Sequence, residues 1–174
     1  MDYCSSVWGV KRRQNLENVQ HSAMRYFLGV HRFTPILAIV GDIGWLPSIY
    51  RRWRSMIQLW NRLILMNDDR LTKKVFKTDL ELHKSSKNWS SEIKQIMNDI
   101  GLSDQFESKS VINLSKVDEH LIVFYIRKWQ EDVQHVPKLR TYKVFNLNLK
   151  QRSMSNSICM KDPLCASLEA ECYY

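Results

Sequence analysis

Apolar side chains recur every three or four positions between residues 44 and 66, which is the spacing of an α-helix that buries one wide stripe. The stripe comprises Leu46, Ile49, Tyr50, Trp53, Met56, Ile57, Trp60, Leu63 and Ile64. Pro47 suits the first turn of this helix, where the missing N–H is not needed. A different face carries a row of arginines, which are Arg51, Arg54 and Arg62, with Arg52 beside the row. The pattern predicts a core helix whose other face is basic.

The same helical period appears elsewhere along the chain, and convincing alternation with a period of two appears nowhere. The other predicted helices cover about residues 11–28, 35–40, 69–83, 88–100 and 116–136, with a further turn near 104–106. In the first of these, the apolar positions at helical spacing are Leu16, Val19, Ala23, Tyr26 and Phe27. Low counts of glycine (5) and proline (4) also favour helices. The chain is predicted to be all-α, an irregular bundle of about five to six helices.

Capping and breaking residues suggest where these helices begin and end. Thr34 and Asn88 are placed to cap the helices that follow them. Residues 41–44 contain two glycines and are expected to break the short apolar helix before them. Ser115 with Asp118 resembles a capping box at the start of the last long helix, although Asp replaces the usual Glu or Gln.

The length of 174 residues, with 44% hydrophobic and 25% charged residues, suits one domain with a sizeable core. After about Leu149 the chain turns to Ser, Asn and Met without periodicity. These features predict a helical domain over residues 1–149 and a disordered tail over residues 150–174.

Positive charge is concentrated in the first third of the chain. The net charge is +8, and residues 1–66 hold 9 Lys and Arg against 3 Asp and Glu, whereas residues 67–174 hold 17 against 15. The excess is therefore +6 in the first part and +2 in the rest. Such asymmetry favours nucleic acid or another anionic surface as a partner.

Catalytic and metal-binding patterns are weak. The pair Asp68-Asp69 invites comparison with the metal-binding carboxylates of a polymerase hairpin, but it follows a helix and precedes no strand, so a helix-ending acidic turn is the better interpretation. Cys159, Cys165 and Cys172 lack the spacing of metal ligands, and the histidines are scattered. No glycine-rich phosphate loop is present. We expect no cofactor, no metal site and no enzymatic activity of the chain on its own.

Targeting signals are not evident either. No apolar run of the signal-peptide type follows Met1, and residues 35–40 are too few to span a bilayer. The irregular spacing of the four cysteines favours a reducing compartment. An intracellular protein, cytoplasmic or nuclear and without a membrane partner, is expected.

Basic residues close to aromatic ones form the candidate binding surface. The candidate nucleic-acid-binding residues are Lys11, Arg12, Arg13, Arg51, Arg52, Arg54, Arg62, Lys138, Arg140 and Lys143. Their side chains suit phosphates, and Tyr142, near the last three, suits stacking on a sugar or base. For each residue taken singly, a solvated helix face is the alternative interpretation.

Several short motifs follow one another in an order that a known family shares. They are Tyr3-Cys4-Ser5-Ser6-Val7-Trp8-Gly9, Leu16-Glu17-Asn18-Val19-Gln20, Arg25-Tyr26-Phe27-Leu28-Gly29-Val30, Gly41-Asp42-Ile43-Gly44-Trp45-Leu46-Pro47, and Trp129 followed by Pro137-Lys138-Leu139-Arg140-Thr141-Tyr142. Together they resemble the region downstream of the palm in reverse transcriptases of LINE-type, non-LTR retrotransposons. The likeness spans about residues 3–145, with Asp42 in place of the family's usual Glu, and the tail does not continue the family's sequence.

The resemblance implies a helical thumb and post-thumb region, which grips a template–primer duplex while the palm performs synthesis. The chain would bind RNA or an RNA–DNA duplex weakly and without sequence preference, and its further partners would be the missing palm and fingers. A helical protein-interaction module is the alternative. A third interpretation is the product of a pseudogene, for which exposed apolar surface around Trp8, Phe33 and Trp45 would be the sign.

Overall fold

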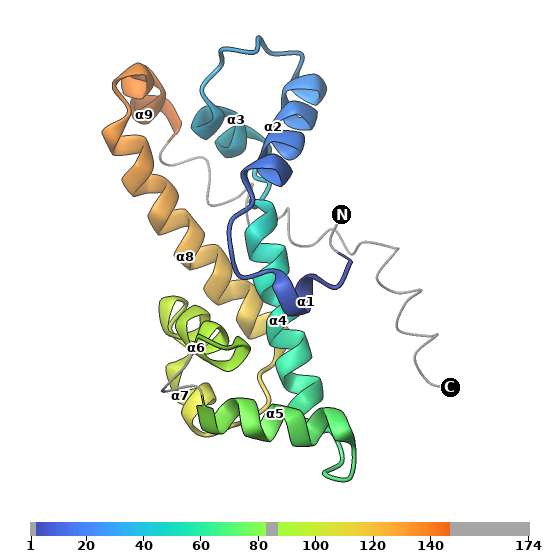
Figure 1. Ribbon diagram of the computed structural model, residues 1–174. Helices are drawn as coiled ribbons and strands as arrows, with labels where there is room; N and C mark the ends of the chain where they lie inside the picture. The colour runs from blue at the N-terminus through green and yellow to red at the C-terminus, as the bar shows by residue number, and fades with distance from the viewer. Residues whose placement is uncertain (1–2, 83–86, 147–174) are drawn as a thin grey trace.

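The computed structural model describes residues 3–82 and 87–146, and over these ranges it contains helices and no strand (Figure 1). The helices are α1 (Ser5–Trp8), α2 (Gln14–Leu28), α3 (Ile36–Ile43), α4 (Ser48–Leu65), α5 (Leu71–Leu82), α6 (Trp89–Asp99), α7 (Ser103–Glu107), α8 (Leu114–His135), the 3₁₀ helix η1 (Pro137–Leu139) and α9 (Arg140–Asn146). The all-α prediction is confirmed. The predicted tail lies outside the described residues.

Helix α4 runs through the middle of the molecule, as its long apolar stripe predicts (Figure 1). The buried members of the stripe are Tyr50, Met56, Ile57, Trp60 and Leu63, and the remaining members are half-buried. At the centre, the Trp60 ring stacks on Phe106 at 5.0 Å and meets the edge of Phe76 at 5.5 Å. Burial of such side chains is worth about 1.5–3 kcal/mol each, so this stripe makes a large contribution to the core.

The indole N–H groups tie loops and helix ends to this core. Trp53 donates to the carbonyl of Val10 at 3.2 Å, Trp89 to Ser6 at 3.0 Å and Trp129 to Leu37 at 2.9 Å. Each bond joins segments more than forty residues apart along the chain. Buried tryptophan usually finds such a partner, because an unpaired N–H away from water is costly. The tryptophans therefore position α1, α3 and the segment before α2.

Helix α5 is fastened to the end of α4 by a buried lysine. The ammonium group of Lys73 donates to the carbonyls of Leu63 and Ile64 at 2.7 and 2.8 Å. These carbonyls belong to the last turn of α4, which lacks partners within the helix. Between the two helices, Asp68 forms an exposed ion pair with Lys77 at 2.8 Å. The Asp68–Asp69 pair thus lies in a turn between helices, as predicted.

Some predicted helix ends are wrong. Helix α2 begins at Gln14 rather than at residue 11, so the basic residues before it lie in a linker. Pro35, not Thr34, is the N-cap of α3, and α3 continues through residues 41–43 to end at Gly44, whose φ is 75°. This positive φ favours glycine. Gly41, the single glycine inside the helix, is buried in the core.

The two predicted N-caps on the later helices have different outcomes. Asn88 caps α6 as expected, accepting from the Ser91 amide at 2.9 Å within a capping box. The capping box expected at Ser115 and Asp118 is wrong, since α8 begins at Leu114 and Asn113 caps it instead. Asp118 lies one turn further along and binds an arginine of α4.

The face of α2 that packs against the core is not the apolar face predicted from the sequence. Tyr26 and Phe27 are 84% and 68% exposed, whereas Glu17, His21 and Met24 are buried. Helix α4 explains the exchange, because it places polar partners for Glu17 opposite this face. A buried carboxylate with partners can occupy a position that an apolar residue would otherwise take.

Candidate nucleic-acid interface

The arginine row of α4 faces solvent in part. Arg51 and Arg62 are exposed, as predicted. Arg54 is half-buried, and its Nε lies 2.7 Å from Oδ1 of Asp118 on α8. The side chain of Arg54 is 40% exposed, so it forms an ion pair and is still in contact with solvent. The prediction of a solvent-facing row is confirmed for two of its three members.

Arg52 was expected beside this row, and that expectation is wrong. Its side chain is fully buried, with Nη2 3.8 Å from Oε1 of Glu17. Each residue of a helix is rotated by about 100° from the one before, and this rotation carries Arg52 away from Arg51 to the side covered by α1 and α2. Arg52 does not contact a ligand from this position.

The buried arginine instead organises the segment that precedes α2. Its Nη1 donates to the carbonyl of Lys11 at 3.1 Å, and its Nη2 lies 3.4 Å from the hydroxyl of Ser48. The Ser48 hydroxyl in turn donates to Oε1 of Glu17 at 2.6 Å. One guanidinium thus joins the linker, α2 and α4. The periodic pattern gave no sign of this network, although Glu17, His21 and Met24 do share one helix face.

Gly9 allows the chain to approach this arginine closely. A Cβ at position 9 would overlap the carbonyl of Ser5 and lie 2.9 Å from the Cβ of Arg52. The Trp8 ring lies 5.8 Å from the Arg52 guanidinium carbon. The Trp-Gly motif is therefore a packing site for the buried cation.

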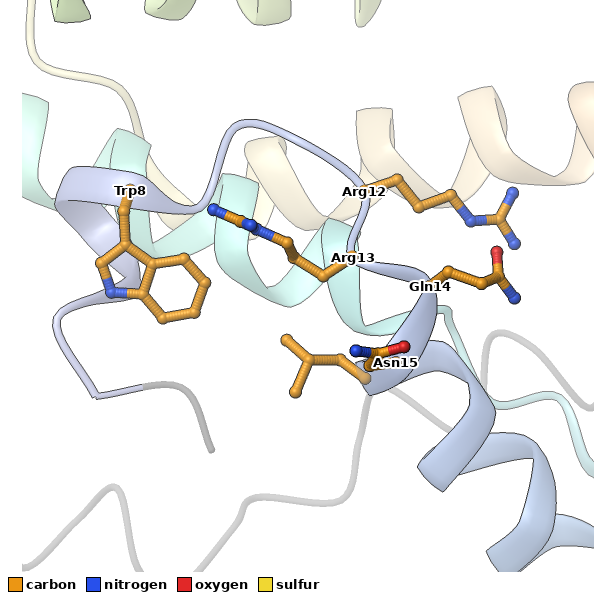
Figure 2. Close-up of a pocket in the computed structure, with 6 residues that line it drawn as sticks. Trp8, Arg12, Arg13, Gln14 and Asn15 are labelled. Atoms are coloured by element: carbon orange, nitrogen blue, oxygen red, sulfur yellow. The ribbon is translucent and has the colours of Figure 1, made fainter.

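The linker residues Lys11, Arg12 and Arg13 are exposed. The two arginines, with Trp8 of α1 and the start of α2, border a hollow of about 400 Å³, whose lining residues are Trp8, Arg12, Arg13, Gln14, Asn15 and Leu16. Figure 2 shows the Arg13 guanidinium directed toward the Trp8 ring, whereas Arg12 extends away from it. The predicted basic cluster thus borders a concave surface beside an aromatic ring.

A smaller hollow of about 230 Å³ links α1 to the arginine row. It is lined by Cys4, Ser5, Ser6, Ser55, Gln58, Leu59 and Arg62. Helix α1 therefore contributes to both hollows, one with the linker arginines and one with Arg62. The first two basic groups predicted from the sequence meet around this short helix.

The third basic group lies elsewhere. Lys138, Arg140 and Lys143 follow the far end of α8, which is distant from α1 (Figure 1). Lys143 is half-buried, with its ammonium group on the carbonyl of Gln134. Tyr142, considered for stacking on a base, has its hydroxyl 2.7 Å from Oδ1 of Asp42 and 2.9 Å from the carbonyl of Ala38. This tyrosine fastens α9 to α3.

Acidic residues are few in the first third of the chain. Within the described residues up to position 66, the carboxylates are those of Glu17 and Asp42. Glu17 is buried beside Arg52, and Asp42 accepts a hydrogen bond from the Tyr142 hydroxyl. Asp118 of α8 forms an ion pair with Arg54 of the row.

Comparisons with known proteins found no match to a family model, to a curated protein or to a solved structure. Within residues 3–82 and 87–146, no three His, Cys, Asp or Glu side chains are grouped so that they could hold a metal ion. No helix in this part of the chain has both the length and the apolar character that crossing a membrane requires.

Proposed function

We propose that this chain is a non-catalytic helical domain similar to the thumb region of non-LTR retrotransposon reverse transcriptases, and that it binds an RNA or RNA–DNA duplex through the phosphate backbone. The observation that carries the proposal is the exposed basic surface around α1. Arg51 and Arg62 of α4 and the linker residues Lys11, Arg12 and Arg13 are exposed, and Arg62 and the two linker arginines line hollows that α1 borders. Phosphate contacts of this kind supply affinity without sequence preference.

The way in which the resembling motifs meet in space supports the proposal. Trp8 and Gly9 pack on Arg52, Glu17 accepts from Ser48, and Tyr142 binds Asp42. Tyr142 and Asp42 thus join two of these motifs directly, whereas Trp8, Gly9 and Glu17 meet through Arg52 and Ser48 of α4.

Binding to an RNA–DNA hybrid duplex at several salt concentrations tests the proposal. The double variant Arg51→Ala, Arg62→Ala should bind several-fold more weakly, and the slope of log K against log salt should fall by about 1.8. The matched control is Arg70→Ala, Lys74→Ala, which removes two exposed charges near the start of α5. An equal loss in both double variants, or no binding of the unmodified chain at low salt, would refute backbone recognition by α4.

A second candidate function follows from the exposed aromatic side chains of α2 and the α2–α3 segment. Tyr26, Phe27 and Phe33 are 84%, 68% and 75% exposed. The rings of Tyr26 and Phe27 lie 6.0 Å apart. Exposed aromatic rings are typical of surfaces that dock a protein, and a palm and fingers would be the partner that the resemblance implies. Partner binding of equal strength at low and high salt, without binding to nucleic acid, would favour this interaction module.

A further inference from the structure

We propose that the hollow between Trp8 and Arg13 binds one unpaired nucleotide of a single-stranded nucleic acid. The base would stack on the indole, and the phosphate would meet the Arg13 guanidinium. This inference rests on the proposed function, and it adds a place where a strand leaving the duplex is held. No sequence motif predicts this site, because it forms only when α1 and the start of α2 meet.

The indole is held in a fixed orientation. Its Nε1 donates to the carbonyl of Tyr3 at 3.0 Å, and the buried guanidinium of Arg52 lies 5.8 Å from the ring. The residue nevertheless remains 37% exposed. A ring that is already oriented loses little freedom when a base stacks on it, and stacking accepts any base because every base has a π-face.

Arg13 supplies the charge beside this ring. It comes from the exposed linker, and its guanidinium is directed toward Trp8 (Figure 2). Arg13 is also the N-cap residue of α2 and makes no side-chain capping bond. The first amides of α2 lack helical partners and add to the attraction for an anion. Asn15 and Leu16 complete the lining, with an amide group for a base edge and an apolar contact.

The aromatic ring beside the charge favours a nucleotide over an acidic peptide. The hollow of about 400 Å³ is open to solvent, which suits a base that stacks on one exposed ring. A carboxylate side chain would use Arg13 but leave the indole without a partner, whereas a nucleotide uses both. Glu17, the acidic residue in the first turn of α2, is buried against Arg52 and does not compete.

Binding of short oligo-uridine and oligo-thymidine tests the site, with the hybrid duplex as the reference ligand. Arg13→Gln and Trp8→Leu should each weaken binding of the single strand about fivefold or more. Trp8→Leu removes no charge and should leave duplex binding much less affected, whereas Arg13→Gln also removes one charge from the proposed duplex surface. Trp8→Phe should retain part of the affinity, since it keeps a ring. Arg13→Gln should also lower the salt slope by about 0.7, whereas Trp8→Leu should not. Arg70→Gln is the matched charge control.

A photo-crosslink locates the base directly. An oligonucleotide carrying 5-iodouracil should form its crosslink in the tryptic peptide 1–11, at Trp8. Circular dichroism of Trp8→Leu checks that the fold survives, and Arg13→Gln, at an exposed position, tests the site independently of it.

The outcomes separate this site from the proposed function. Normal duplex binding with a single-strand affinity that Arg13→Gln and Trp8→Leu do not change would overturn the nucleotide site alone. Absence of binding to every nucleic acid would overturn both proposals. Equal binding of an acidic peptide without aromatic residues would show that charge alone is recognised, and would also overturn the nucleotide site.

Discussion

The hydroxyl of Tyr142 lies 2.7 Å from the carboxylate of Asp42, and this contact joins two helices that are a hundred residues apart in the chain. The same hydroxyl is 2.9 Å from the carbonyl of Ala38. Burial and the bond to Asp42 raise the pKa of Tyr142 well above its usual value. Helix α9 is therefore attached to α3 through a neutral phenol and a carboxylate, and the motif residues at these two positions have a structural role.

Replacing Tyr142 by Phe should lower the free energy of unfolding by about 1–2 kcal/mol, because the hydrogen bond to a charged acceptor is lost while the ring remains. Urea unfolding followed by circular dichroism measures the change. Tyr26→Phe is the matched control, since this ring is 84% exposed and its hydroxyl has little to lose. In a double-mutant cycle with Asp42→Asn, additive effects would contradict a direct Tyr142–Asp42 contact.

The buried pair of Glu17 and Arg52 leads to a second prediction about stability. Arg52→Met should destabilise the fold by about 3–5 kcal/mol, because the Glu17 carboxylate would be left in the core without its counter-charge. The double variant Glu17→Leu, Arg52→Met should recover a large part of this loss, since neither charge then remains buried. Thermal unfolding of the two single variants and the double variant measures these changes in stability. A double variant that loses the sum of the two single effects would mean that the charges do not interact.

His21 makes the stability depend on pH. Burial lowers its pKa from the ordinary value of 6.5; Glu17 opposes this effect, whereas Arg12 and Arg25 add to it. The unfolded chain therefore takes up a proton at His21 before the folded chain does, so the free energy of unfolding falls as the pH is lowered through about 6.5. Above that pH the imidazole is neutral in both states and contributes no dependence.

The His21→Gln variant should lose this part of the pH dependence, and His31→Gln, at an exposed position, should keep it. Urea unfolding from about pH 8 to about pH 5 provides the comparison. Other groups titrate near the acid end of this range, but they act alike in all three proteins. Parallel curves for the unmodified chain and His21→Gln would show that His21 does not couple to folding.

The central helix could be predicted from the sequence because its stripe obeys one period and one kind of side chain. The predicted stripe of α4 includes Trp60 and Ile57, which are fully buried. The same reasoning did not predict which residues of α2 are buried. Glu17 and His21 are polar and would be expected at the surface, and Arg52, the partner of Glu17, lies on another helix. Periodicity describes one helix at a time, whereas a buried polar network depends on how two helices meet.

The candidate site, like the fold, could be predicted from the sequence only in part. The exposure of Arg51 and Arg62 follows from the position of each on the helix wheel. The hollow beside Trp8 depends instead on the path of the linker, which the Arg52–Lys11 bond sets across forty-one residues. Its residues are Trp8 and residues 12–16, which are close in sequence, but their concave arrangement is a tertiary property.

The ion pair between Arg54 and Asp118 leads to a test in which affinity should rise. Asp118→Asn would free the Arg54 guanidinium, whose Nε now lies 2.7 Å from the carboxylate, and would remove the charge that opposes the arginine row. The variant should bind a hybrid duplex more tightly, with a salt slope larger by about 0.9, the value for one additional phosphate contact.

The matched control for this test is Glu119→Gln, which removes the same charge from an exposed neighbouring position of α8 that makes no ion pair with Arg54. Long-range repulsion alone would make the two variants equal, because both reduce the negative charge by one. A greater gain for Asp118→Asn, abolished when Arg54→Ala is added, would place the duplex at the α4 row. Equal gains, or none, would place it elsewhere on the protein.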